Sequence, residues 1–163
     1  MRILASQLQR LRRMLCVMLF VCVGLGVPAL ADNEIFVDIV IQNRQSQEFR
    51  YSAELAHTPT LRSRGLMYRQ EFSSGQAMLF IWPVSARRLF WMKNTLVALD
   101  ILFFSEDGNL FHIVHQAQPE TEILHSSELP AATVIELKGG ETKRLNIDIG
   151  SKLTIETALP EAR

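Results

Sequence analysis

The sequence after residue 31 contains no cysteine, because the chain's two cysteines, Cys16 and Cys22, both precede that point. A domain built from the later residues cannot form a disulfide, use a thiolate nucleophile or bind a metal ion through thiolates. Its stability must therefore come from a hydrophobic core and from backbone hydrogen bonds.

The same part of the chain has little basic charge. Residues 1–31 hold four of the 17 Lys and Arg residues and none of the 17 Asp and Glu residues, which leaves 13 basic and 17 acidic residues and a net charge of −4. Domains that bind nucleic acids carry a basic surface for the phosphates. The charge balance therefore excludes nucleic acid as the expected partner.

The first 31 residues have the pattern of a cleaved export signal. Basic residues precede an apolar run at 14–27, and Ala29-Leu30-Ala31 follows as a cleavage pattern. An apolar run of 14 residues is shorter than the ~20 that a membrane-spanning helix needs. We expect a signal peptide at 1–31, a single β-rich domain at 32–163, and a periplasmic or secreted protein. The alternative is an uncleaved segment that tethers the protein to the inner membrane.

Short segments rich in β-branched and aromatic residues predict a mainly β domain. Within residues 97–117, two apolar runs flank Asp107-Gly108, a pair typical of a two-residue type I′ hairpin turn. Further strands are expected at 34–43, 48–56, 77–82 (ended by Pro83), 88–92 and 132–140, and after Gly150.

One short helix is expected near residues 59–65. Thr58 is a suitable N-cap, Pro59 suits the first helical position, and Gly65 is a stop signal. A single helical turn is also expected after Gly140. Seven or eight strands in a domain of this size favour an α+β, mainly β fold, a small, mostly antiparallel, partly closed barrel that leaves few unpaired edges.

Asp100 interrupts an otherwise apolar strand between Leu99 and Ile101. Burying an unpaired carboxylate is costly, so a buried Asp100 needs a cation or hydrogen-bond donors. One interpretation places Asp100 on a solvated face of the barrel. The other, which we favour, places it in a cleft, held by Arg64 or by Asn94.

The stretch "FWMKNT" at 90–95 places ammonium, amide and hydroxyl groups beside a tryptophan. Two arginines bracket "GLMY" at the end of the predicted helix, and the guanidinium fork binds carboxylates and other anions. A plainer interpretation has the arginines on the surface, and for Trp91 and Met92 we favour a position in the core. The candidate ligand-binding residues are Arg64, Arg69, Trp91, Lys93, Asn94 and Asp100.

His112 and His115 form an H-x-x-H pattern. Residues three apart on a strand point to opposite faces, and no third ligand accompanies them. We therefore predict neither a metal site nor a cofactor.

The blocks "TPTLRSRGLMYR", "AMLF", "FWMKNTLVALDILF", "DGNL" and "VIELKGG" resemble, in order and spacing, the bacterial and archaeal family known as domain of unknown function 192. The resemblance covers residues 36–157 and implies a small exported or membrane-tethered β-rich domain without an established activity. Ala77 and Ala98 stand where the family usually has Gly and Pro. The signature positions that the resemblance marks are Arg64, Gly65, Met67, Arg69, Trp91, Met92, Asn94, Thr95 and Asp100.

Three functions are compatible with these residues. The first, which the lack of a nucleophile–base motif favours, is a periplasmic binding or accessory module with a cleft for a small anionic or polar ligand or a partner's peptide. The second is an acid–base enzyme that uses Asp100, with Lys93 or Arg64 stabilising negative charge. The third is a structural polar network that only fixes the strand register.

Overall fold

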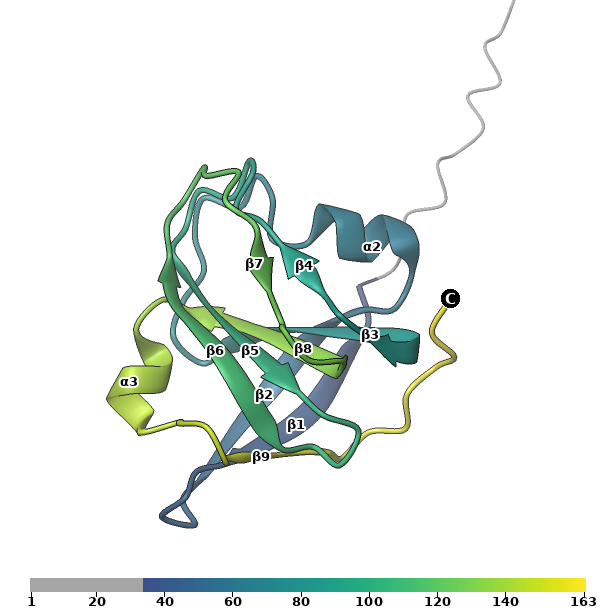
Figure 1. Cartoon of the computed structure of the whole chain (residues 1–163), viewed down its shortest axis with the longest axis vertical. Helices are drawn as coiled ribbons and strands as arrows, with labels where there is room; N and C mark the ends of the chain where they lie inside the picture. Colours follow the sequence, from purple (N-terminus) through teal and green to yellow (C-terminus); the bar gives the residue numbers. More distant parts are fainter. Residues whose placement is uncertain (1–33) are drawn as a thin grey trace, which may run out of the picture. The chain divides into compact units, whose positions relative to one another are not determined.

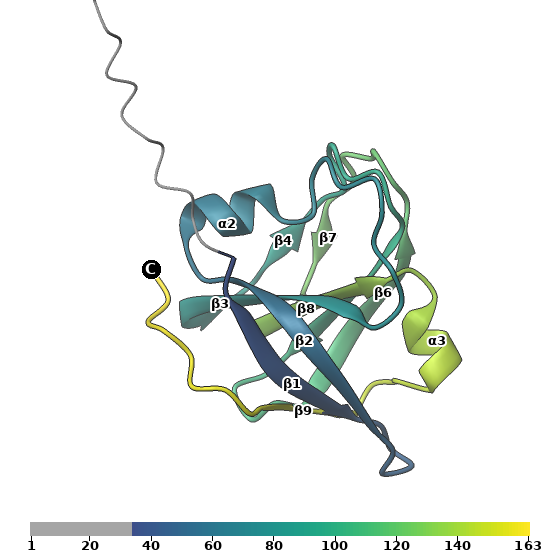
Figure 2. The same cartoon turned by 180° about the vertical axis from the view of Figure 1, so that it is seen from behind.

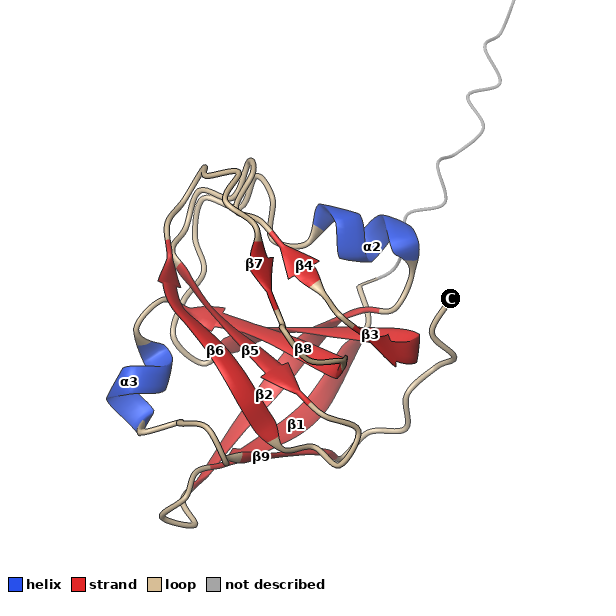
Figure 3. Cartoon of the chain, in the orientation of Figure 1, coloured by secondary structure: helices blue, strands red, loops and turns tan. Residues whose placement is uncertain are grey.

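The computed structural model describes residues 34–163. The signal peptide predicted for residues 1–31 lies outside the described residues. Within residues 34–163 no helix has the length and hydropathy needed to cross a bilayer. Strands dominate this part of the chain, with two short helices (Figure 3). The predicted mainly β fold class is confirmed.

The elements follow one another along the chain as drawn in Figure 1. The helices are α2 (Pro59–Arg64) and α3 (Glu141–Leu145), so the helix predicted near 59–65 is confirmed and α3 fills the segment expected to form one helical turn. The strands are β1 (Phe36–Gln42), β2 (Glu48–Ala56), β3 (Gln76–Ala86), β4 (Leu89–Phe90), β5 (Leu99–Phe104), β6 (Leu110–Ala117), β7 (His125–Ser126), β8 (Ala131–Lys138) and β9 (Lys152–Ile155).

Seven strands form one sheet in the order β6-β5-β8-β3-β2-β1-β9, and β4 pairs with β7 in a separate ribbon. The neighbours in the large sheet are antiparallel except for β2 and β3. The sheet curls until its two edge strands come together through a bridge between Asn109 and Lys152. Figure 2 shows β1, β2 and β9 crossing the near side of this curl. The predicted small, mostly antiparallel, partly closed barrel is therefore confirmed.

Side chains alternate along a strand, so the sheet has two apolar faces. We call them the α3 face, which also packs Leu145 and Ile147, and the α2 face, which also packs Leu61 and Phe90. The buried residues of the α3 face include Ile39, Leu79, Leu102, Phe104 and Ile135, and those of the α2 face include Met78, Phe80, Ile101, Phe103 and Val134.

Helix α2 begins and ends with the signals that the sequence contains. The Thr58 side chain accepts a hydrogen bond from the backbone N–H of Leu61, Pro59 occupies the first turn, and Gly65 ends the helix. The guanidinium of Arg62 donates to the carbonyl oxygens of His57 and Ile81, which ties the helix to β3. In both views α2 lies beside the β4–β7 ribbon (Figures 1 and 2).

Two local expectations are wrong. The β5–β6 hairpin forms, but of its two predicted turn residues only Gly108 has a positive φ, of 72°, whereas a type I′ turn needs a positive φ at both. The turn instead begins at Ser105, whose carbonyl accepts from the N–H of Gly108 at 3.0 Å. Strand β3 also runs past Pro83, because its register with β8 shifts between Ile81 and Ala86 and the proline lies within that irregularity.

Candidate functional site

Asp100 projects from the α3 face of the sheet. In the β5–β8 ladder Asp100 pairs with Leu137, whereas the next residue, Ile101, pairs with Glu136. Since neighbouring side chains on a strand point to opposite faces, Asp100 and Glu136 lie on opposite sides of the sheet. Helix α2 and the ribbon that leads into "FWMKNT" cover the other side, the α2 face.

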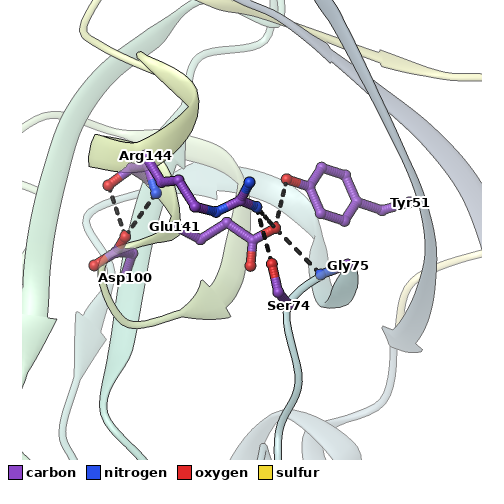
Figure 4. A network of polar contacts seen from close by, with 7 residues as sticks. Tyr51, Ser74, Gly75, Asp100, Glu141 and Arg144 are labelled. Carbon is purple, nitrogen blue, oxygen red and sulfur yellow. Dashed lines mark hydrogen bonds and ion pairs between the residues drawn. The ribbon is translucent and has the colours of Figure 1, made fainter.

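The buried carboxylate of Asp100 accepts four hydrogen bonds. Backbone N–H groups donate from Gln116 at 2.8 Å, Gly140 at 3.0 Å and Thr142 at 2.9 Å, and the Thr142 hydroxyl donates at 2.6 Å. The prediction that Arg64 or Asn94 holds Asp100 is therefore wrong. The reason is the strand's period of two, which turns Asp100 away from both. Asp100 joins β5 to β6 and to the start of α3, and its contacts with α3 are drawn in Figure 4.

A second buried carboxylate extends this network. Oε1 of Glu141 accepts hydrogen bonds from the Tyr51 hydroxyl at 3.2 Å, the Gly75 N–H at 3.2 Å and Arg144 at 3.4 Å (Figure 4). Burial, together with the neighbouring Glu141 carboxylate, raises the pKa of the Tyr51 hydroxyl. These contacts connect α3 to β2 and to the segment before β3, which is a structural role.

A cavity of about 400 Å³ lies on the α2 face. Its lining comes from α2 and the residues after it, from β3, from β4 and the following stretch, and from β8. The lining residues are Pro59, Arg62, Ser63, Arg64, Gly65, Leu66, Met67, Phe80, Trp82, Leu89, Phe90, Trp91, Thr95 and Glu136. We call this cavity the α2 pocket.

Glu136 is the buried carboxyl group of the α2 pocket. Its residue is 5% exposed, and Oε2 has no hydrogen-bond partner within residues 34–163. The other buried side-chain atoms without a partner in that range belong to His57, His125 and Glu141, which do not line the α2 pocket. Burial raises the pKa of Glu136 to about 8, and the charge of Arg69 opposes this shift. Glu136 is therefore largely protonated at neutral pH.

Arg69 is already paired. Its guanidinium forms an ion pair with Glu54, a β2 residue that is 7% exposed. Glu54 and Glu136 both stand opposite Met78 in the sheet, Glu54 from β2 and Glu136 from β8, so the three side chains share the α2 face. Arg69 thus acts on two buried carboxyl groups. It contacts Glu54 directly, and its charge opposes the rise in the pKa of Glu136.

Aromatic rings form the apolar wall of the α2 pocket. The ring of Phe90 meets Phe80 edge-on at 5.1 Å and Phe103 at 5.8 Å between centroids. The Trp82 ring meets Phe90 in the same way at 6.3 Å. Such edge-to-face contacts add to the packing energy of the rings and hold the β4 aromatic residue in place.

The six candidate residues divide between four locations. Arg64 and Trp91 line the α2 pocket. Trp91 is 43% exposed, so the core position favoured for it is wrong, whereas Met92 is buried as expected. Lys93 and Asn94 lie in the adjoining loop, where Lys93 pairs with Glu122 at 3.2 Å and Asn94 donates to the Tyr68 hydroxyl at 2.9 Å. Arg69 pairs with Glu54, and Asp100 lies on the α3 face. The structure therefore gathers Arg64 and Trp91 but not the whole set, and a ligand-binding role for these residues stays a prediction.

Sequence reasoning missed Glu136. It stands between Ile135 and Leu137 in the segment "VIELKGG". A single carboxyl group within an apolar strand is also the pattern that singled out Asp100. The same reasoning applied to Glu136 would have identified it. Within residues 34–163 no group of three or more His, Cys, Asp or Glu side chains is placed to hold a metal ion.

Comparison with known proteins gives a family but no activity. No curated protein matches the chain. A crystal structure from Sinorhizobium meliloti 1021, described as that of a proposed transcription regulator, is 32% identical with a TM-score of 0.72, over 75% of this chain and 95% of that one. A protein of unknown function from Novosphingobium aromaticivorans DSM 12444 is 29% identical with a TM-score of 0.72, over 77% of this chain and 89% of that one.

A family model matches the chain as well. The model for DUF192, described as "Uncharacterized ACR", covers residues 39–155. These residues include the second half of β1, all of the later strands, both described helices and the complete α2 pocket. The chain belongs to the DUF192 family.

Proposed function

We propose that this protein is an exported binding module and that its binding site is the α2 pocket. The observation that carries the proposal is the Oε2 atom of Glu136, which is buried at the pocket without a partner among residues 34–163. Folded proteins pair nearly all of their buried polar atoms. An unpaired carboxyl oxygen beside a cavity is therefore a group that a ligand can satisfy.

The pocket has the mixture of surfaces that small-molecule sites require. Such sites combine apolar walls with a few polar groups that fix the ligand's orientation. Here Phe90 and Trp91 supply apolar surface, Glu136 supplies a buried acid, and Arg64 supplies an exposed guanidinium. A small polar or anionic ligand satisfies all of these groups together. The volume of about 400 Å³ suits such a ligand better than a long peptide.

The cellular location follows from the N-terminal sequence. A basic segment, a short apolar run and Ala29-Leu30-Ala31 favour export with cleavage after residue 31. The mature protein then acts in the periplasm or outside the cell, or stays tethered to the inner membrane if the segment is retained. The description of the S. meliloti relative as a transcription regulator is not carried over, since residues 32–163 have a net charge of −4.

Acid–base catalysis at the same pocket is the second candidate function. A general acid or base works best when its pKa lies near the working pH, and burial raises the pKa of Glu136 to about 8. Asp100 does not suit this role, because it is fully buried and its carboxylate already accepts four hydrogen bonds. Conversion of a bound compound that stops in Glu136→Gln would distinguish the enzyme from the binding module.

A thermal-shift screen of the exported protein tests the proposal. We expect at least one class of small polar compound to raise the Tm of the wild type by several degrees. Arg64→Gln and Glu136→Leu should lose this response, because each removes a polar group of the pocket. Arg50→Gln is the matched control, since Arg50 is an exposed arginine on β2 whose contacts are to Glu48 and Glu156.

The result that contradicts the proposal is equally specific. If the same compounds stabilise Glu136→Leu and the wild type by the same amount, the ligand binds elsewhere on the molecule. If a broad library that includes acids, amines and neutral compounds stabilises neither, the α2 pocket is not a small-molecule site.

A further inference from the structure

Two of the three charged residues that line the α2 pocket are arginines. Arg64 is exposed, and its guanidinium has no hydrogen-bond or ion-pair partner within the described part of the chain. Arg62 donates to the carbonyl oxygens of His57 and Ile81 and to a main-chain oxygen of Arg163. Two cationic side chains of α2 therefore border the pocket. Their combined field attracts an anion and repels a cation.

The acid in the pocket does not cancel this field at neutral pH. Burial favours the neutral form of Glu136, whose pKa lies at about 8. Arg69 is the cation whose charge opposes this shift, and Arg69 is paired with Glu54. Glu136 then presents a carboxylic acid O–H, which is a hydrogen-bond donor to any acceptor that enters the pocket.

The aromatic rings argue against a cationic ligand. Aromatic pockets bind ammonium groups through the faces of the rings. Here protein cations already lie over two of those rings, with the Arg88 guanidinium 4.1 Å from the Trp82 ring centroid and the Lys93 ammonium 5.2 Å from that of Trp91. At these two rings a ligand ammonium would meet the positive charge of Arg88 or Lys93 and not a free ring face.

We propose that the α2 pocket binds a small organic acid in its carboxylate form. The carboxylate accepts a hydrogen bond from the Glu136 acid group and pairs with Arg64, while the apolar body of the ligand packs against Phe90 and Trp91. This assignment rests on the proposed function, because it requires the α2 pocket to be the binding site. It goes further in naming the charge and chemical class of the ligand.

A proton has to remain on Glu136 for this ligand to stay bound. Once Glu136 ionises, two carboxylates face each other and the hydrogen bond is lost. The affinity should therefore fall about tenfold for each pH unit above the pKa of Glu136. The charged groups on the same side of the sheet as Glu136 are Arg62 and Arg64, which line the pocket, and Glu54 and Arg69, which pair with each other; of these, Arg69 opposes the rise in the pKa of Glu136.

Calorimetric titrations with three matched compounds test the assignment. Benzoate, benzylamine and benzamide share an aromatic ring and differ in charge, and each is titrated into the protein at pH 6, 7, 8 and 9. We expect benzoate to bind most tightly at pH 6 and 7 and to weaken about tenfold per pH unit above pH 8. Glu136→Gln keeps a hydrogen-bond donor at every pH, so its affinity for benzoate should not vary with pH. Arg64→Gln should bind benzoate at least tenfold more weakly at all four pH values.

The possible results separate this inference from the proposed function. If benzylamine or benzamide binds more tightly than benzoate, and this binding is lost in Glu136→Leu, the ligand class is wrong but the pocket remains the site. A benzoate affinity that is independent of pH in the wild type also overturns the proton-linked recognition. If no compound in the broad library gives a response that depends on the pocket, both proposals fail together.

Discussion

Asp100 and Glu136 lie one ladder position apart in the β5–β8 pair, yet their carboxyl groups project from opposite faces of the sheet. The Asp100 carboxylate accepts four hydrogen bonds, three of them from backbone N–H groups. The Glu136 carboxyl has an unpaired Oε2 and lies beside a cavity. Both residues are buried, at 0% and 5% exposure respectively.

The difference between the two sites teaches that burial alone does not identify a functional acid. A buried carboxylate surrounded by donors contributes to stability, because removing it would leave those donors unpaired. A buried carboxyl without a donor lowers stability, since its desolvation is not repaid within the protein. We infer that the α3 face carries the structural acid and the α2 face carries the functional one.

The largest expected effect follows from Asp100→Asn. An asparagine keeps one oxygen and replaces the other by an N–H₂ donor, so the two groups that donate to the replaced oxygen lose their acceptor. We expect the free energy of unfolding to fall by about 3–5 kcal/mol, the usual range for breaking a buried charged contact. Urea denaturation at pH 7 measures this loss.

The exposed Asp38 on β1 provides the matched control. Asp38→Asn should change the unfolding free energy by less than about 0.5 kcal/mol, as is usual for surface positions. If Asp100→Asn and the wild type unfold with the same free energy, Asp100 does not have the structural role assigned to it.

Glu136→Leu is expected to stabilise the protein, in contrast to Asp100→Asn. Leucine fills a similar volume on the apolar α2 face and removes an acid whose burial is uncompensated. We expect the free energy of unfolding at pH 7 to rise by about 1–3 kcal/mol. If urea denaturation shows a clear loss of stability instead, Glu136 has a structural partner and the two acids do not differ.

The pH dependence of stability sharpens the same contrast. Burial raises the folded pKa of Glu136 from 4.5 to about 8, so the folded protein holds this proton more tightly than the unfolded chain does. The stabilisation that comes from this tighter proton binding is complete below pH 4.5, decreases as the pH rises toward 8, and is lost above 8. The free energy of unfolding falls over this range by at most about 1.4 kcal/mol per pH unit. Urea denaturation between pH 5 and pH 9 should show this slope in the wild type and a smaller one in Glu136→Gln.

Tyr51→Phe has the smallest expected effect. The change removes one hydroxyl donor to Glu141 and leaves the packing of the ring, so we expect a loss of about 1 kcal/mol. Tyr68→Phe is the control, because Tyr68 is 67% exposed and its hydroxyl contact with Asn94 lies in the solvent. A thermal melt in which both variants match the wild type would mean that the network around Glu141 adds no stability.

Local signals in the sequence were enough to predict much of the fold. The alternation of residues 48–56, the cap at Thr58 and the glycine at 108 each act within a few positions, and β2, α2 and the hairpin formed as those signals indicate. The turn type differed because Gly108 also contacts β9, where its carbonyl accepts from the N–H of Leu153 at 2.8 Å. Contacts between distant segments of this kind are absent from local patterns.

The site could be predicted only in part, for the same reason. The need of Asp100 for partners was read correctly from its apolar neighbours, but its donors come from β6 and α3, 16 to 42 positions further along the chain. The alternation of side chains along a strand is enough to show that Asp100 and Ile101 face opposite sides of the sheet. The placement of Glu136 opposite Ile101 depends on the register between β5 and β8, which no local pattern specifies.

That register has a consequence for how homologous chains can differ in length. Deleting one residue within β8 would carry Leu137 onto the α2 face and turn the acid at position 136 into the apolar α3 face, so both the pocket and the core would be damaged at once. An insertion in the segment between β6 and β8 leaves this alternation intact. Length variation within the family is therefore expected to concentrate in loops such as 118–124, while β5 and β8 keep a constant number of residues.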